Sequence, residues 1–327
     1  MTKFLQQILK IFLPFAFGLA ILWWMYREAN WNDFVLAITT EIHWGWMALS
    51  LVFGVLPAIF RGLRWRQSLE PLGEKPSKRL CCDAIFISYA ASLIIPRVGE
   101  VVRCGVLKKH AQTPFSKALG TVVTERVVDS MLMMLIAVIA LFSQLPEFMR
   151  FSRETGMDLH GMLARFTSTG YIVTFVCILL IFITLTLLLW QLKAFEKGRR
   201  FIKQLLDGIM SLKNIENQGL YWVYSIGIWV AYYLHFYLAF YSFDFTSHIG
   251  PMAGLLMFSI STFAVLVPTP NGAGPWHFAV KTMLVLWGVA EEPAIIFALV
   301  VHTIQTLLVV VCGMGAMVKQ YKIKNNK

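Results

Sequence analysis

Residues 118–143 read ALGTVVTERVVDSMLMMLIAVIALFS. About 20 predominantly apolar residues form a helix that crosses the hydrocarbon core of a bilayer, so this run predicts a transmembrane helix. Three charged residues, Glu125, Arg126 and Asp129, stand near its start. Charged side chains inside a span usually face the interior of a helix bundle or a water-filled cavity. The stretch therefore predicts a membrane fold with a polar site inside it.

Further apolar blocks occur on both sides of this run. They fall near residues 11–26, 44–60, 82–96, 169–190, 220–243, 251–268, 276–290 and 294–318. Hydrophobic residues make up 57% of the 327-residue chain and charged residues only 14%, whereas soluble domains carry about 25% charged residues. We therefore predict an all-α integral membrane protein, a polytopic helical bundle, and exclude a soluble enzyme.

The net charge of +11 does not indicate a nucleic-acid-binding protein, because the basic residues stand between the apolar blocks. With the N-terminus inside, 24 of the 29 Lys and Arg residues fall on the inner side and 4 on the outer side. Cytoplasmic loops carry this kind of excess. The prediction is a multi-pass protein of the cytoplasmic (inner) cell membrane, with an uncleaved first span and both termini in the cytoplasm.

The block at 82–96 is too short for a span, since it has barely a dozen apolar residues between Asp83 and Pro96. The residues that follow it are charged, and a crossing would carry them through the membrane. We therefore expect residues 82–117 to form a hairpin that enters and leaves on the cytoplasmic side.

The order of the blocks repeats along the chain. Spans at 11–26 and 44–60, a Pro-interrupted segment at 82–117 and a span at 118–143 are followed by spans at 169–190 and 220–243, an interrupted segment at 251–290 and a span at 294–318. The first set starts inside and the second outside, which is typical of transporters. We predict two inverted-topology repeats, residues 1–165 and 166–327, each with a Pro-broken re-entrant hairpin.

Arg97, Glu100 and Arg103 are spaced three residues apart, which would place them on one broad side of a helix. Glu100 could then hold both guanidinium groups, whose planar forks suit a phosphate. Pro96 and Gly99 would break the helix and expose backbone N–H groups that attract anions. The alternative is an amphipathic cytoplasmic turn that only follows the positive-inside bias.

Glu125 and Asp129 share a helix face, and Arg126 can pair with Asp129. We expect these three residues in the site; the alternative is that they lie at the interface and extend toward water. Arg61 and Arg64, at the end of the second span, are most simply topology anchors. They could also border the path of a headgroup.

A third motif, Pro268-Thr269-Pro270-Asn271-Gly272-Ala273-Gly274-Pro275-Trp276-His277, puts three prolines and two glycines inside an apolar segment followed by a histidine. Such a run cannot be a continuous helix, and its freed backbone groups must face protein or water. It predicts a hinge or re-entrant loop that lines a cavity. His277 and His302 could carry a proton there, although a single histidine in a membrane is often only a packing residue.

These motifs together resemble the lysylphosphatidylglycerol synthase transmembrane region, the flippase-like membrane half of the multiple peptide resistance factor. The resemblance rests on Arg61-x-x-Arg64-Trp65, Pro96-Arg97-x-Gly99-Glu100-x-x-Arg103, Glu125-Arg126-x-x-Asp129 and Pro268-x-Pro270-x-Gly272-x-Gly274. The family loop usually reads Pro-Gly-Gly-x-Gly followed by Glu, where this chain has Asn271 and His277. The family's soluble aminoacyl-transferase domain is not among these residues, so the resemblance implies a stand-alone transport half.

We therefore expect a lipid flippase or transporter that moves a phospholipid, or another lipid with a phosphate headgroup, between leaflets. The expected headgroup-binding residues are Arg61, Arg64, Arg97, Glu100, Arg103, Glu125, Arg126 and Asp129, and the expected hinge residues are Pro96, Gly99, Pro268, Pro270, Asn271, Gly272, Gly274 and His277. No cofactor, metal or nucleic acid is expected. The expected partners are membrane phospholipid and either a second copy of the chain or a separate lipid-synthesising protein.

Two alternatives remain open. In the first, the chain is an intramembrane enzyme that acts on a lipid-linked substrate, with Glu100, Glu125 and Asp129 as acid, base or metal ligands; the family label would then be phosphatidylglycerol lysyltransferase. In the second, it is a membrane scaffold that transports nothing, and replacing Arg97 or Glu125 with alanine leaves its function intact. The absence of a G-x-x-x-x-G-K-[ST] motif speaks against direct nucleotide-driven pumping.

Overall fold

The computed structural model describes residues 23, 42–145, 211–267 and 269–325. Within these residues the chain is helical and forms no strand, as expected for an all-α fold. The spans expected near 11–26 and 169–190, and the repeat boundary at 165/166, lie outside the described residues. The two repeats as sequence domains therefore stay a prediction.

The described helices follow one another in the order α3 (Trp44–Leu69), α4 (Lys78–Ile94), α5 (Gly99–Ala111), α6 (Phe115–Ser143), α11 (Gln218–Phe240), α12 (Pro251–Ala264), α13 (Pro275–Leu286) and α14 (Glu291–Asn325). Among them, α3, α6, α11 and α14 are long and apolar enough to cross a membrane. They correspond to the blocks at 44–60, 118–143, 220–243 and 294–318. The chain is a polytopic membrane protein.

The remaining helices form two helical hairpins, α4–α5 and α12–α13. These helices have between 12 and 17 residues, which is about 18 to 26 Å at 1.5 Å per residue. None of them alone covers the roughly 30 Å of hydrocarbon in a bilayer. The breaks fall where they were expected, after Ile94 and between Ala264 and Pro275. Entry and exit of each hairpin on one side of the membrane stays a prediction.

Local signals in the sequence explain where several helices begin. Ser77 caps α4, with its hydroxyl accepting from the backbone N–H of Leu80 at 3.2 Å. Pro251 and Pro275 occupy the first positions of α12 and α13, where proline costs no hydrogen bond and its fixed φ suits a helix.

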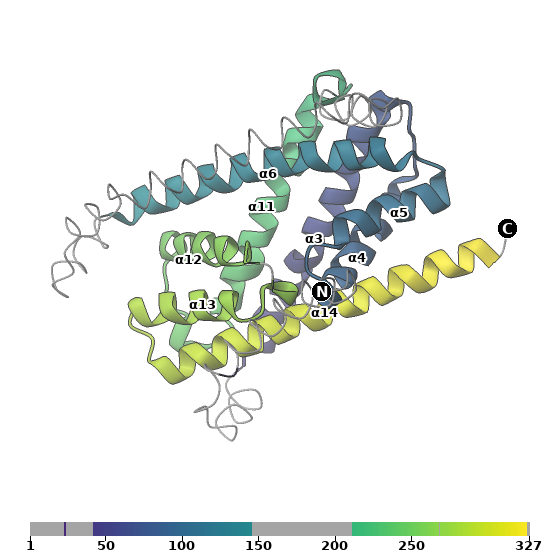
Figure 1. Ribbon diagram of the computed structural model, residues 1–327. Coiled ribbons are helices and arrows are strands. Elements are labelled where there is room, and N and C mark those ends of the chain that lie inside the picture. Colours follow the sequence, from purple (N-terminus) through teal and green to yellow (C-terminus); the bar gives the residue numbers. More distant parts are fainter. Residues whose placement is uncertain (1–22, 24–41, 146–210, 268, 326–327) are drawn as a thin grey trace, which may run out of the picture.

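The packing relates the two halves of the fold. α3 packs against α11; α4 packs against α14, and α12 packs against α6 in the equivalent way. Figure 1 shows both hairpins between α6 and α14, with α4–α5 on the right and α12–α13 on the left. The first helix of each hairpin thus contacts the long helix that follows the other hairpin. This pairing brings the two hairpins toward each other at the middle of the bundle.

The hydrophobic core also divides by halves. One cluster lies within residues 58–122 and centres on Trp65, Ile85 and Leu107. A second cluster is built mainly from residues 229–301 and is rich in aromatic rings such as Phe240 and Phe297. A small third cluster joins Val128 of α6 to Ile215 and Tyr221. Each hairpin is thus anchored in the core of its own half, which leaves the space between the hairpins free for a site.

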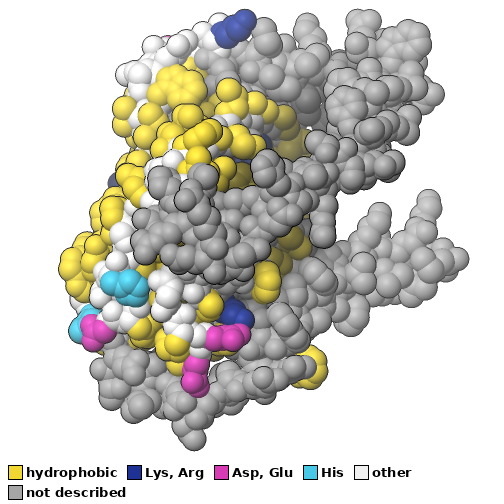
Figure 2. All heavy atoms as spheres, turned by 90° about the vertical axis from the view of Figure 1, so that its left-hand side faces the viewer, with side chains coloured by type: hydrophobic (Ala, Val, Ile, Leu, Met, Phe, Trp, Pro, Cys, Tyr) yellow, Lys and Arg dark blue, Asp and Glu magenta, His cyan; other side chains and the backbone are white. Residues whose placement is uncertain are grey.

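The outer surface is apolar over long stretches. On α6 the exposed residues include Met131, Leu135 and Phe142, and on α14 they include Leu307 and Val311. Figure 2 shows hydrophobic side chains over most of the described surface in view, with acidic and histidine side chains near its lower end. A contiguous apolar surface of this kind is expected to face lipid.

Gly99, an expected hinge residue, allows the hairpin α4–α5 to close. A Cβ at this position would overlap the backbone oxygen of Ser88 and the hydroxyl of Ser92 on α4. We expect Gly99→Ala to lower the free energy of unfolding by about 1–3 kcal/mol, because neither helix can give way without repacking. Unfolding of the purified protein by SDS titration measures this loss.

Gly105 provides the matched control, because it lies on the same helix and a Cβ there meets nothing within 4 Å. Gly105→Ala is expected to leave the protein unchanged or to stabilise it by about 0.5–1 kcal/mol. Equal effects of the two substitutions would show that α4 and α5 do not pack as described.

Candidate functional site

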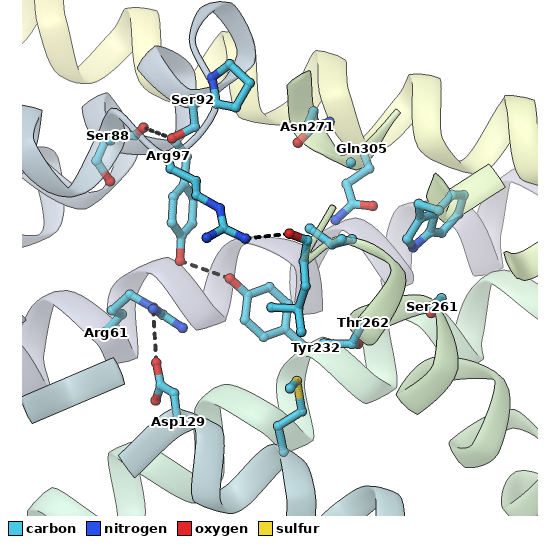
Figure 3. A pocket seen from close by; sticks show the side chains of 18 of the residues that line it. Arg61, Ser88, Ser92, Arg97, Asp129, Tyr232, Ser261, Thr262, Asn271 and Gln305 are labelled. Atoms are coloured by element: carbon cyan, nitrogen blue, oxygen red, sulfur yellow. Dashed lines mark hydrogen bonds and ion pairs between the residues drawn. The ribbon is translucent and has the colours of Figure 1, made fainter. Parts of the chain in front are cut away.

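A cavity of about 670 Å³ lies where the two hairpin ends meet. Residues from all eight described α-helices, α3, α4, α5, α6, α11, α12, α13 and α14, line it, together with the segments that follow α4 and α12. In Figure 3, Arg61 and Asp129 lie on one side, Asn271, Gln305, Ser261 and Thr262 on the other, and Arg97 and Tyr232 between them. Its volume is in the range of small-molecule sites, about 300–1,000 Å³.

The turn between α4 and α5 brings Arg97 into this cavity. Arg97 has φ 61°, a left-handed conformation that few non-glycine residues adopt and that is often found at functional sites. Its guanidinium donates to the backbone oxygen of Leu266, at the end of the other hairpin. The two hairpins are therefore joined at their ends by one arginine.

The segment that follows α12 has the same feature. Asn271 has φ 52° directly after Pro270, just as Arg97 follows Pro96. Gly272 and Gly274 also have positive φ, 70° and 91°, so three left-handed residues turn the chain back into α13. Asn271 and Gly272 line the cavity, so the broken segment forms part of its wall; Pro268 lies outside the described residues.

Asp129 holds two arginines of α3 beside the cavity. Its carboxylate accepts from Nη1 of Arg64 at 2.7 Å, and the other carboxylate oxygen lies 3.1 Å from Nη1 of Arg61. All three side chains are buried. Buried charges persist when they are paired and hydrogen bonded, so this carboxylate makes the burial of both arginines possible.

Glu125 lies one turn before Asp129 on α6 and is fully buried. It accepts from Nη1 of Arg103 at 2.9 Å and lies 3.6 Å from Nε of Arg64. The guanidinium of Arg103 also stacks over the ring of Trp65, at 4.7 Å from the ring centroid. Arg103 is thus fixed on two sides while it faces the cavity.

Glu100 pairs with Arg126, which corrects two expectations. Glu100 was expected to hold Arg97 and Arg103, and Arg126 was expected to pair with Asp129. The first fails because Arg97 precedes α5 in a left-handed turn and is not on its helical face. The second fails because Asp129 is already occupied by Arg61 and Arg64.

The interpretation of Arg61 and Arg64 as topology anchors at the headgroup level is also wrong. Both side chains are buried in the bundle. Arg61 lines the cavity, as the alternative expected, whereas Arg64 lies behind it with Glu125. The alternative for Glu125, Arg126 and Asp129, that they extend to the interface, fails for Glu125 and Asp129, which are buried.

The cluster carries more positive than negative charge. Its described members are the arginines Arg61, Arg64, Arg97, Arg103 and Arg126 and the carboxylates Glu100, Glu125 and Asp129. With every group ionised, the surplus is two positive charges. Nε of Arg61 and Nη2 of Arg103 are buried without a hydrogen-bond partner among the described residues. The charged side of the cavity therefore offers unused donors and positive charge, which suits an anion.

Three expected hinge residues lie beside the cavity and do not line it: Pro270, Gly274 and His277. Nδ1 of His277 accepts from the backbone N–H of Gly274 at 3.3 Å, and its ring lies 4.3 Å from that of His302. His302 reaches the cavity wall and its Nε2 donates to the backbone oxygen of Asn271 at 3.1 Å. Both histidines thus form hydrogen bonds to backbone groups of the broken segment. A role in proton transfer stays a prediction.

Sequence reasoning missed most of the uncharged lining. It includes Tyr89 and Tyr232, whose hydroxyls are 2.9 Å apart, and also Trp229, His235, Ser261, Thr262 and Gln305. These residues stand in apolar helices without a motif, so only the face of the helix on which they lie identifies them. Within the described residues, no group of three His, Cys, Asp or Glu side chains is placed to hold a metal ion.

Comparison with known proteins gives one family and one partial relative. The profile of the family described as "Lysylphosphatidylglycerol synthase TM region" matches residues 11–313. A protein named "Glycosyltransferase AglD", from Haloferax volcanii, is 33% identical over 84 residues, which cover 25% of this chain and 14% of that protein. The chain thus matches only a small part of this relative. No solved structure matches it.

Proposed function

This chain belongs to the family of the lysylphosphatidylglycerol synthase transmembrane region, and on that premise we propose that it moves a phosphate-headgroup lipid between the leaflets of its membrane. Family membership alone supports a membrane protein with a lipid-related role. The proposed function is that of a flippase, or lipid transporter, with the headgroup in the cavity between the hairpins.

The observation that carries the proposal is the position of the cavity. It lies between two hairpins whose helices are each too short to cross, and it is lined by Arg61, Arg97, Arg103 and Arg126. Helices broken near the middle of the membrane form the substrate sites of many transporters. A phosphate crossing the bilayer needs donors that replace water, and the unused donors of Arg61 and Arg103 supply them.

The acyl chains have no need to enter the cavity. α6 and α14 expose apolar side chains along their length, so the tails can stay in lipid while the headgroup moves through the bundle. Alternating access would require the two hairpin ends, joined by Arg97 and Leu266, to separate on one side and then on the other. Rocking of one half against the other provides this motion in transporters built from repeats.

An enzymatic role finds less support in this site. Glu100, Glu125 and Asp129 each lie beside an arginine, and a carboxylate held in an ion pair is a poor base, because its charged form is stabilised. The relative named as a glycosyltransferase matches over a short segment only. We therefore propose transport without a chemical step, in the cytoplasmic membrane and with both termini inside.

Reconstitution tests the proposal. The purified chain is placed in liposomes that contain a trace of acyl-labelled fluorescent phosphatidylglycerol, and dithionite added outside bleaches the lipid that reaches the outer leaflet. We expect bleaching beyond the outer half of the label, at a rate that rises with the number of chains per vesicle. Protein-free vesicles, and vesicles with an unrelated membrane protein at equal density, are the controls. A rate equal to these controls would refute the flippase function.

A further inference from the structure

The side of the cavity opposite the ion-pair cluster carries no charged side chain among the described residues. We call it the uncharged side, and define it by Trp229, His235, Ser261, Thr262, Trp276 and Gln305. Figure 3 shows Ser261, Thr262 and Gln305 across the cavity from Arg61 and Asp129. A phosphate bound at the arginines leaves the hydrogen-bonding groups of this side to water or to a second part of the ligand.

Two buried side chains of α11 have hydrogen-bonding atoms without partners among the described residues. They are Nε1 of Trp229 and Nε2 of His235, on residues that are 8% and 4% exposed. Unpaired polar atoms are rare inside proteins and usually indicate a ligand, water or function. Both residues line the cavity, and the two nitrogen atoms themselves are buried in its wall.

The chemical character of each atom follows from the bonds around it. Nδ1 of His235 lies 2.8 Å from the backbone oxygen of Ser50, which can only accept, so Nδ1 carries the proton. Nε2 of the neutral ring is then an acceptor. The indole nitrogen of Trp229 is a donor. A ligand that pairs with both atoms must therefore donate one hydrogen bond and accept another.

The hydroxyls on α12 add acceptors. Ser261 and Thr262 both donate to the backbone oxygen of Phe258, at 2.9 and 2.7 Å, so their lone pairs remain for a ligand. The amide of Gln305 has no hydrogen bond within the described part of the chain and can both donate and accept. The uncharged side thus mixes donors and acceptors without charge.

This mixture selects among headgroups. A hydroxyl is both donor and acceptor and matches it, whereas an ammonium offers only donors and would leave Nε1 of Trp229 unpaired. An ammonium would also need a carboxylate, and Glu100 and Asp129, the acidic residues that line the cavity, are already held by arginines. The surplus positive charge of the cluster repels a cation further.

The geometry points to an anionic lipid whose headgroup carries neutral hydroxyl groups beyond the phosphate, and not to a cationic aminoacyl lipid. The phosphate lies against Arg61, Arg97 and Arg103, and the hydroxyls against Trp229, His235 and Gln305. This assignment rests on the proposed function, because it uses the same cavity. A free polyol phosphate shares this chemistry, so the experiment must separate the two sources.

Phosphatidylglycerol and phosphatidylpropanol provide a matched pair of substrates, since they have the same charge and headgroup length and differ only in two hydroxyls. In the dithionite assay we expect phosphatidylglycerol to move about tenfold faster or more, because two hydrogen bonds are lost with the second lipid. Lysylphosphatidylglycerol, which carries a positive headgroup, is expected to move more slowly than phosphatidylglycerol. Radiolabelled glycerol 3-phosphate is expected not to enter the vesicles.

Gln305→Leu tests the uncharged side itself. It removes a hydrogen-bonding amide from α14 and keeps a helix-forming side chain of similar size. We expect the ratio of the phosphatidylglycerol rate to the phosphatidylpropanol rate to fall about fivefold. Gln218→Leu, an exposed position at the start of α11, is the control and is expected to keep the native ratio.

The outcomes separate this inference from the function on which it rests. Movement of neither lipid above protein-free vesicles would refute the flippase function itself. Equal movement of both, or a Gln305→Leu ratio equal to that of Gln218→Leu, would overturn the hydroxyl assignment and leave the flippase intact. Faster movement of lysylphosphatidylglycerol would overturn the exclusion of cations. Uptake of glycerol 3-phosphate would show that the ligand is a free polyol phosphate and would overturn the assignment to a lipid.

Discussion

Asp129→Ala is expected to lower the free energy of unfolding by about 3–5 kcal/mol, because it leaves two buried arginines without their common partner. Arg61 lies 3.1 Å and Arg64 2.7 Å from the carboxylate oxygens of Asp129. Arg64 cannot reach water without unpacking α3 from the bundle, and Arg61 faces only the cavity. SDS titration of the purified protein, followed by tryptophan fluorescence, measures the loss.

The matched control is Asp244→Ala. Asp244 also has a nitrogen-bearing partner, the ring of His43 at 2.9 Å, but its side chain is 91% exposed, and exposed pairs contribute about 0–1 kcal/mol. Asp129→Asn keeps the shape and an acceptor, so we expect a loss between those of the two alanine variants. If Asp129→Ala and Asp244→Ala lower the free energy of unfolding by the same amount, the ion-pair cluster does not hold the bundle together.

The membrane fold could be predicted from the sequence, because length and apolarity alone decide whether a helix can cross a bilayer. The described spans match the expected blocks at 44–60, 118–143, 220–243 and 294–318. The two breaks could also be predicted, since Pro96 and the Pro/Gly run after Ala264 cannot continue a helix. These signals are local, and they hold whatever the rest of the chain does.

The ion pairs could not be predicted from spacing. Arg103 and Glu125 lie on different helices, and so do Arg64 and Asp129. Spacing along one helix suggested Arg97–Glu100–Arg103 and Arg126–Asp129, but tertiary packing placed better partners within reach. The burial of Arg61 and Arg64 was missed for the same reason: the carboxylate that makes it possible comes from α6.

The uncharged side was missed for a different reason. Trp229, His235 and Gln305 stand singly in apolar helices, and a single polar residue in a span carries no motif. Only the arrangement of α11, α12 and α14 around one cavity gives these residues a common role. A helical-wheel comparison of 220–243 and 294–318 would have placed them on inner faces but could not have brought the faces together.

The central claim is that a lipid phosphate meets Arg97 inside the cavity, and Arg97→Gln tests it most directly. Arg97 is exposed to the cavity, and its one hydrogen bond to the described residues goes to the backbone oxygen of Leu266. No described carboxylate lies within ion-pair distance of it, so its removal strands no buried charge. A charge-assisted hydrogen bond to an ion contributes about 1.5–3 kcal/mol.

Arg79→Gln is the control, because Arg79 is an exposed arginine near the start of α4, outside the cavity lining. The measurement is the rate of phosphatidylglycerol movement in liposomes that hold equal amounts of each folded variant. We predict that Arg97→Gln lowers this rate about 10- to 100-fold relative to Arg79→Gln. A rate for Arg97→Gln that equals or exceeds that of Arg79→Gln would contradict the account, since the phosphate would then cross without this arginine.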